Sequence, residues 1–216
     1  MKYLTYNTQK FNFADMIAES LGYSNLELIH NASDFEYTEK FERANDQSTH
    51  YHQRYYTLAR TEAFQNLYTE FIREVVKPEF GTEVVYQTIP TFRLHFPGNI
   101  AVGEFHRDRN YRDIEWASRV REFNFFLPFT SAYGTNTIWV ESSEGLEDFS
   151  PIVCDYGQTV MWDGSNLLHG NKTNVEPTTR VSVDFRVMSI DSYEPSTHGS
   201  INTKTQFTLG GYYSKI

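Results

Sequence analysis

Residues 180–187 read Arg180-Val181-Ser182-Val183-Asp184-Phe185-Arg186-Val187, a strict alternation of polar and apolar side chains. Successive side chains of a β-strand point to opposite faces of a sheet, so the alternation predicts a strand. One face of this strand is wholly apolar, which suits contact with a hydrophobic core. The other face carries two arginines, a serine and an aspartate, which suits a polar site.

Four further segments alternate in the same way, though less strictly: 91–96, 122–127, 136–141 and 159–163. Their predicted apolar faces carry Phe92, Leu94 and Phe96, then Phe123, Phe125 and Leu127, then Ile138 and Val140. Their predicted polar faces carry Arg93, His95, Asn124, Thr137 and Trp139. Roughly eight strands fit between the Gly and Pro turns. We therefore expect a mainly β fold with flanking helices (α+β), namely a double-stranded β-helix or cupin-like jelly roll with a polar ligand site inside.

Helical signals precede the strands. Asn12, with an acidic residue three positions later, starts a short helix that Gly22 ends. Residues 25–30 are expected to continue as another turn or helix. A longer amphipathic helix is predicted over 58–76, ending before Pro78.

We expect one domain over residues 1–216. Residues 34–54 are polar, have weak periodicity and receive no assignment. The domain is predicted to have helical support in 1–80, a jelly-roll core in 84–188, and in 189–216 either a surface tail or a lid over the site.

Composition limits the kind of partner. The chain has a formal net charge of −9 and a pI near 5.2, which disfavours nucleic acid or an anionic membrane as partner. Cys154 is the single cysteine, so no disulfide can form within the chain. The first residues lack the apolar core of a signal peptide, and no run approaches the roughly 20 apolar residues of a membrane span. We expect a cytoplasmic protein that acts on a small molecule, in an oligomeric state that the sequence leaves open.

One short motif offers metal ligands. Glu104-Phe105-His106-Arg107-Asp108 contains an H-x-D pair, and in an extended strand both ligand side chains point to one side. Two histidines and one carboxylate on one face of an octahedron are the ligand set of non-haem Fe(II) oxygenases. His169, in a second polar segment, is the candidate third ligand. Two alternatives stay open: ordinary hydrogen bonds in a polar core, or other metal ligands, namely the pair His50 and His52, which we expect at the surface, and His95.

The spacing of these residues resembles the Fe(II)/2-oxoglutarate-dependent dioxygenases: H-x-D, a distant His169, and Arg180 eleven residues later in an Arg-x-Ser pair. The stretch from 91 to 187 is similar, more narrowly, to hydroxylases of streptomycin-type biosynthetic clusters. That stretch covers a little under half the chain. The motifs that carry this second resemblance are Pro97-Gly98-Asn99, Tyr133-Gly134-Thr135-Asn136-Thr137 and Trp162-Asp163-Gly164.

The resemblance implies Fe(II) held by His106, Asp108 and His169, with 2-oxoglutarate and O2 as cosubstrates and with release of succinate and CO2. Arg180 and Ser182 would hold the remote carboxylate of 2-oxoglutarate, since a planar guanidinium grips a carboxylate with two parallel hydrogen bonds. The expected reaction is hydroxylation of a small polar metabolite or natural-product intermediate. Halogenation is excluded, because the related halogenases lack the carboxylate that Asp108 supplies.

The remaining candidates are weaker. Asn124 and Thr137 are candidates for binding the keto-acid end of the cosubstrate, and the candidates for contacting substrate are Arg93, His95, Trp139 and Arg186. Arg186 is also the alternative to Arg180 as the carboxylate clamp. For Arg180 itself the alternative is an ordinary ion pair with Asp184 or Glu176. Arg107 lies between two ligands, is expected to point away from the metal and receives no role.

A rival function uses the same fold. A non-oxidative cupin-like metal- or sugar-binding protein, or an isomerase, could hold a metal on the same three residues. Arg180 and Ser182 discriminate between the two functions, because a non-oxidative site has no use for a dicarboxylate clamp.

Overall fold

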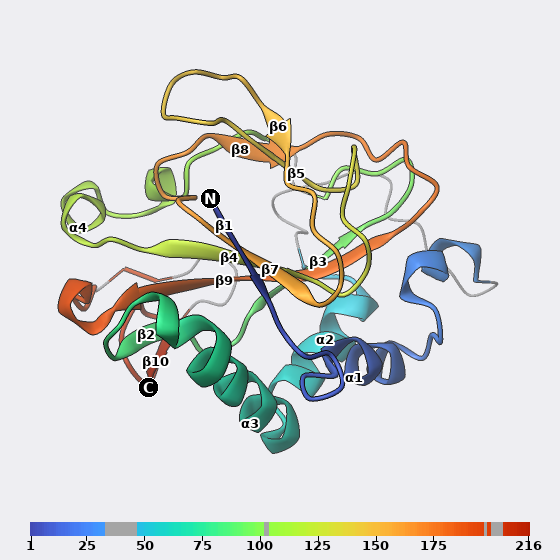
Figure 1. Ribbon diagram of the computed structural model, residues 1–216, viewed down its shortest axis with the longest axis horizontal. Coiled ribbons are helices and arrows are strands. Elements are labelled where there is room, and N and C mark those ends of the chain that lie inside the picture. The colour runs from blue at the N-terminus through green and yellow to red at the C-terminus, as the bar shows by residue number, and fades with distance from the viewer. Residues whose placement is uncertain (33–46, 102–103, 197, 200–204) are drawn as a thin grey trace.

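The computed structural model describes residues 1–32, 47–101, 104–196, 198–199 and 205–216. Two antiparallel sheets lie face to face (Figure 1). The large sheet has the strand order β1 (Lys2–Thr5), β7 (Gln158–Trp162), β4 (Phe123–Pro128), β9 (Arg180–Ser189), β2 (Val84–Gln87) and β10 (Tyr213–Lys215), and β3 (Thr91–His95) also pairs with β9. The small sheet has the order β6 (Ser150–Pro151), β5 (Ile138–Val140) and β8 (His169–Asn171). The predicted mainly β jelly roll with flanking helices is confirmed.

Strand β9 contains the alternating stretch and runs through the middle of the large sheet. β4 pairs along one of its edges, and β3 and β2 pair in succession along the other. Its apolar face, from Val181 to Val187, is buried in a hydrophobic core. Its polar face, from Arg180 to Arg186, lines a pocket that side chains of β8 also line. Both predicted faces of this strand are confirmed.

Helices cover the outer face of the large sheet (Figure 1). They are α1 (Phe13–Leu21), α2 (His50–Ala59) and α3 (Glu62–Phe71). Tyr55 of α2 stacks on Phe92 of β3 with ring centroids 4.4 Å apart, and Tyr68 of α3 meets Phe185 of β9 edge-on at 5.4 Å. Shorter elements are η1 (Leu26–Asn31), η4 (Asp108–Tyr111), α4 (Ile114–Arg119) and η5 (Ile190–Ser192). Among the described residues, no helix combines the length and apolar character needed to cross a membrane.

The helix predicted over 58–76 is wrong at its start. α2 ends at Ala59, and α3 begins at Glu62 because the Thr61 side chain accepts a hydrogen bond from the backbone N–H of Phe64 and caps a new helix. The end is close to the prediction, since the helix continues as a π-helical turn, η2 (Ile72–Val76), and a 3-10 turn, η3 (Lys77–Glu79). α2 begins within segment 34–54, which received no assignment; residues 34–46 of that segment lie outside the described part.

Both ends of the chain belong to the large sheet, contrary to the predicted limits of the jelly-roll core. β1 pairs with β7, and β10 pairs with β2. Tyr213 of β10 is fully buried, so residues 213–215 are neither a surface tail nor a lid. Strands of three or four residues are too short to display a clear alternation, which is why the sequence pattern missed them.

The faces of the segment 136–141 are the reverse of the prediction. Ile138 and Val140 of β5 point into the sandwich, where they pack with Phe126 and Trp162 of the large sheet. In Figure 1 no helix of the described residues covers the outer face of the small sheet, so its apolar side chains pack against the large sheet instead. Trp139, expected in the site, is therefore on the outer face.

Candidate metal centre

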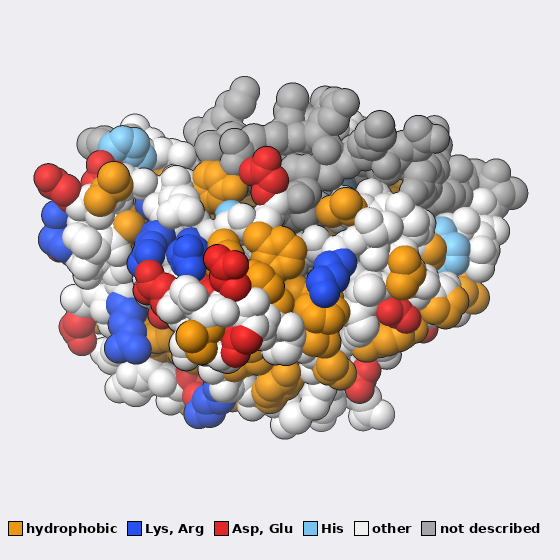
Figure 2. Space-filling model, turned by 90° about the horizontal axis from the view of Figure 1, so that it is seen from above, with side chains coloured by type: hydrophobic (Ala, Val, Ile, Leu, Met, Phe, Trp, Pro, Cys, Tyr) orange, Lys and Arg blue, Asp and Glu red, His pale blue; other side chains and the backbone are white. Residues whose placement is uncertain are grey.

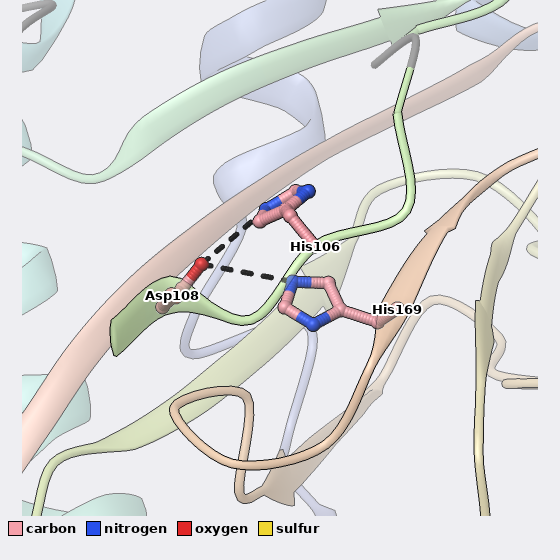
Figure 3. A group of neighbouring side chains, drawn as sticks. All are labelled: His106, Asp108 and His169. Carbon is pink, nitrogen blue, oxygen red and sulfur yellow. Dashed lines mark ion pairs between the residues drawn. The ribbon is translucent and has the colours of Figure 1, made fainter. Parts of the chain in front are cut away.

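The structure brings His106, Asp108 and His169 together. Their ligand atoms all lie within 4.8 Å of one another, and the three side chains point toward a common centre (Figure 3). Asp108 Oδ1 is 3.4 Å from His106 Nε2 and 3.7 Å from His169 Nε2. These separations are short enough for the three side chains to hold one metal ion. These residues are the one such group in the described part of the chain.

Backbone pairing sets the positions of the two histidines. His106 and His169 exchange hydrogen bonds between backbone N–H and C=O, at 2.8 and 3.0 Å. Asp108 is the first residue of the 3-10 helix η4, so the expectation of one continuous extended strand through both ligands is wrong. Its backbone N–H donates to the carbonyl of Gly164 at 3.0 Å, which holds the turn against the loop after β7.

The other ring nitrogen of each histidine is also occupied. His106 Nδ1 lies 2.9 Å from the carbonyl of Glu104, and His169 Nδ1 lies 2.9 Å from the carbonyl of Leu167. A neutral imidazole that donates from Nδ1 presents the lone pair of Nε2, which is the atom facing Asp108. Burial lowers the pKa of His169 to about 4, so this ring is neutral at pH 7.

Asp108 is held by one of its two oxygens. Oδ2 accepts hydrogen bonds from Arg186 Nη2 at 2.6 Å, Arg186 Nε at 3.1 Å and Asn124 Nδ2 at 2.8 Å. Burial alone would raise the pKa of Asp108, but the Arg186 guanidinium and the two histidines outweigh burial and hold this pKa well below its usual range. Oδ1 therefore remains available to a cation.

The competing pair does not form a metal site in the described residues. His52 is buried rather than at the surface: its Nδ1 lies 2.7 Å from Thr49 Oγ1, and its ring packs on Phe92. His50 lies against Tyr51.

A pocket between the sheets adjoins the triad. It is lined by Arg93, His106, Asn124, Phe126, Ile138, Trp162, His169, Gly170, Asn171, Arg180, Ser182, Asp184 and Arg186. Arg180 is 1% exposed, and its Nε and Nη1 have no hydrogen-bond partner among the described residues. Ser182 Oγ is equally buried and unpartnered. Burial and the nearby Arg93 lower the pKa of Arg180 to about 9, so it is a cation at pH 7. Asp184 offsets this lowering only in part. Among the described residues, no acidic side chain forms an ion pair with this buried cation.

The alternative of an ordinary ion pair for Arg180 does not fit these contacts. Asp184 instead accepts hydrogen bonds from Arg93 and Arg186, and Glu176 accepts them from Thr135. Arg93 and Arg186 are consequently paired cations, and Arg186, expected to contact substrate, binds Asp108.

Three candidates have structural roles in this arrangement, contrary to expectation. Thr137 Oγ1 donates to the carbonyl of Ile152 at 2.7 Å, and Trp139 Nε1 donates to the carbonyl of Gly134 at 2.9 Å. His95 is fully buried, with Nδ1 3.0 Å from the Asn136 carbonyl and Nε2 2.9 Å from the Asn99 carbonyl. None of the three lines the pocket.

Two residues that sequence reasoning missed adjoin the site. Trp162 is 3% exposed, its ring lies edge-on to His169 at 4.4 Å, and its Nε1 is buried without a partner among the described residues. The register of β4 and β7 places Trp162 opposite Asn124, so it shares the inner face with a residue that binds Asp108. Glu141 is the other; it is 1% exposed and follows β5 directly. The sequence could not reveal the role of Glu141, because nothing in a charged residue at the end of a strand shows which distant residues it contacts.

Fold and site together define a jelly-roll protein with a candidate two-histidine, one-carboxylate metal centre. No protein-family model matches the sequence. The chain is 36% identical over 213 residues to the streptomycin biosynthesis protein StrG of Streptomyces griseus, and the alignment covers 99% of this chain and 97% of the relative. The chain therefore belongs to the family of StrG.

Solved structures with a similar arrangement are more distant. The non-heme monooxygenase ThoJ, in a nickel complex, is 10% identical with a TM-score of 0.46, over 86% of this chain and 71% of that one. SnoN, a non-heme alpha ketoglutarate dependent epimerase from nogalamycin biosynthesis, is 11% identical with a TM-score of 0.44, over 92% and 85%.

Proposed function

We propose that this protein is a mononuclear non-haem Fe(II)/2-oxoglutarate-dependent oxygenase that hydroxylates a small polar metabolite or natural-product intermediate. Bound iron, with 2-oxoglutarate and O2 as cosubstrates, would supply the oxidising chemistry and yield succinate and CO2. The donor set fits this metal, because His106, His169 and Asp108 offer three ligands to one side and leave further positions open.

The observation that carries the proposal is Arg180. A buried guanidinium without an anion is costly, and a ligand carboxylate would relieve that cost. Two nitrogens of Arg180 and the hydroxyl of Ser182, in the same pocket as the histidines, have no hydrogen-bond partner in the described part of the chain. A dicarboxylate with one end near the triad and the other at Arg180 would satisfy these donors. A metal-binding protein or isomerase that takes no dicarboxylate has no need of them.

The other residues of the pocket prepare it for that ligand. Asn124 and Arg186 orient Asp108 by its Oδ2, so that Oδ1 faces the two Nε2 atoms. Phe126, Ile138 and Trp162 line the pocket with apolar surface, which keeps water away from the reacting groups.

The substrate class is proposed from the relative. StrG is named for streptomycin biosynthesis, and the two chains align over almost their full lengths. A role in making or modifying a polar natural product is therefore proposed here as well. With Asp108 present, hydroxylation is proposed and halogenation is not.

The test is succinate formation. Purified protein with Fe(II), ascorbate and 2-oxoglutarate should form succinate, faster when the true substrate is included in a panel of polar metabolites. His106→Ala and His169→Ala should abolish both succinate formation and tight binding of Mn(II), measured by calorimetry. Binding of a metal without any affinity for 2-oxoglutarate would favour the non-oxidative cupin-like function.

A further inference from the structure

We infer that Glu141 and Arg107 form a buried clasp that positions the metal ligands. The clasp rests on the proposed metal centre but lies outside it, since neither residue belongs to the triad. Glu141 is 1% exposed, and Oε1 of its carboxylate accepts a hydrogen bond from Arg107 Nη2 at 2.8 Å. Arg107 is the residue between His106 and Asp108, so any movement of its backbone moves both ligands.

The same carboxylate holds the segment of the third ligand. Glu141 Oε1 also accepts from the backbone N–H of Leu168 at 2.6 Å, and the N–H of Glu141 donates to the carbonyl of Leu168 at 3.1 Å. Leu168 directly precedes His169. One oxygen atom therefore connects the chain segments that carry all three ligands.

Arg107 makes a second connection between these segments. Its Nε donates to the carbonyl of Asn166 at 2.7 Å, three residues before His169. The planar guanidinium thus bridges the Glu141 carboxylate and the His169 loop with two donors in a fixed geometry, which a lysine ammonium cannot reproduce.

The second oxygen of Glu141 is anchored on its own loop. Oε2 accepts from the backbone N–H of Gly145 at 2.9 Å and of Glu147 at 3.2 Å. Glu147 has φ of 53°, an unusual value for a residue with a side chain, and this turn directs its N–H toward the carboxylate. Four donors converge on one buried carboxylate, so its charge is compensated and its orientation is set.

The clasp explains why the triad can be ready before metal arrives. The three ligands lie on two separate segments, so other residues must hold those segments together while the metal is absent. Removing an outer residue that fixes a metal ligand commonly changes metal affinity about 10–100-fold. Glu141 and Arg107 are positioning residues in this sense, because they touch the ligand segments and not the metal position.

The test compares Co(II) affinity and Co(II) absorption spectra at low temperature in the full-length protein. Glu141→Gln keeps the shape of the side chain but removes the charge that compensates Arg107. We expect its Kd for Co(II) to rise at least about tenfold, with an altered spectrum, while far-UV circular dichroism shows the metal-free variant folded. Arg107→Lys keeps the charge but loses the bridge, so its Kd for Co(II) should rise by a smaller factor. This variant replaces Glu141→Gln in the test if Glu141→Gln does not fold.

Glu144→Gln is the matched control. Glu144 lies in the same loop and pairs with Arg109, the residue after Asp108, at 2.6 Å, but these side chains are 51% and 37% exposed. Basic and acidic side chains lie side by side on the face seen in Figure 2. Exposed pairs contribute little, so Co(II) affinity should stay within about twofold of wild type.

The outcomes separate the two proposals. If the wild-type protein binds Co(II) and both clasp variants bind it equally well with unchanged spectra, the clasp is only structural and the inference fails alone. If the wild-type protein binds no divalent metal, the proposed metal centre fails and the clasp with it. A Kd that rises in the clasp variants and not in Glu144→Gln supports positioning.

Discussion

At the residue scale, the three arginines that line one pocket differ in whether an acidic side chain forms an ion pair with them. Arg93 and Arg186 bind acidic side chains, whereas Arg180 is buried beside the ring of Phe126 and forms no ion pair with any residue that the structure describes. Residue type and strand face are the same for Arg180 and Arg186. Their neighbours give them different chemistry: Arg186 orients a metal ligand, and Arg180 is available to a ligand's carboxylate.

Arg180→Lys is expected to raise the Kd for 2-oxoglutarate at least tenfold. The ammonium keeps the charge but loses the bidentate geometry, and charge-assisted hydrogen bonds contribute about 1.5–3 kcal/mol each. Calorimetry in the presence of Mn(II) measures the change. Arg121→Lys, at an exposed arginine that lies over Phe123, is the control and should have no effect. Loss of affinity in Arg186→Lys with none in Arg180→Lys would mean that Arg186 is the clamp.

At the scale of elements, close approach of two segments sets the separation of the ligands. Gly170 follows His169 in β8, and a Cβ added there would lie 2.8 Å from the Phe105 ring and 3.1 Å from the Phe105 Cα. Phe105 directly precedes His106. Only glycine therefore allows the two histidine segments to pair at the observed distance.

Gly170→Ala should consequently weaken metal binding by about tenfold or more, because the methyl group pushes β8 away from the segment of His106. Mn(II) titration monitored by electron paramagnetic resonance checks this. Asn110→Ala, at an exposed position of η4, is the control. Gly145→Ala is unsuitable as a control, because the positive φ of Gly145 would strain an alanine there. Equal affinity in wild type and Gly170→Ala would show that Phe105 yields without moving the ligand.

The C-terminal strand provides a second prediction at this scale. Tyr213→Ala should reduce the free energy of unfolding by about 3–5 kcal/mol, the range for truncating a buried aromatic residue. Tyr213 is fully buried, and its hydroxyl donates to Glu122 at 2.5 Å. Urea denaturation gives the value. Lys215→Ala, at the exposed end of β10, should lower the free energy of unfolding only slightly. If Tyr213→Ala also lowers it only slightly, residues 213–215 behave as a surface tail and not as a strand of the sheet.

At the scale of the whole molecule, buried histidines make the metal-free protein sensitive to acid. Burial lowers the pKa of His95 to about 3, against an ordinary value of 6.5. Between these values the unfolded chain binds a proton that the folded chain does not, so acidification favours unfolding. His169, with a pKa near 4, acts in the same direction.

The free energy of unfolding should therefore fall as the pH decreases from 6.5 toward 4, by at most about 1.4 kcal/mol per pH unit for each such histidine. His95→Gln should make this dependence less steep, as measured by urea denaturation at several pH values. The opposite outcome is a His95 ring that stays protonated in the folded protein, where it would donate a hydrogen bond to each of the two neighbouring carbonyls. An unchanged slope in His95→Gln would show that the folded protein keeps this ring protonated.

The amino-acid sequence by itself determined the features that depend on local periodicity. Alternation in residues 180–187 predicted both the strand and its two faces. The apolar and charged side chains differ so strongly in polarity that the strand has one stable orientation, with Val and Phe toward the core. The H-x-D pair and His169 were recognisable because metal coordination restricts residue type and spacing. The short helix α1 and its end at Gly22 were predicted from capping signals; Gly22 has the left-handed conformation of a C-cap, but the Asn12 side chain makes no capping hydrogen bond.

Only the tertiary structure decided which of these residues share an environment. The orientation of β5 depends on what covers its outer face, so local pattern placed Thr137 and Trp139 wrongly. The short strands β1 and β10 exist because each is hydrogen-bonded to a partner distant in sequence. Arg186 pairs with Asp108 and Asp184, whereas Arg180 forms no ion pair among the described residues, and Glu141 acquires its role from Arg107 and Leu168. Such contacts join residues far apart in the chain, and local periodicity carries no information about them.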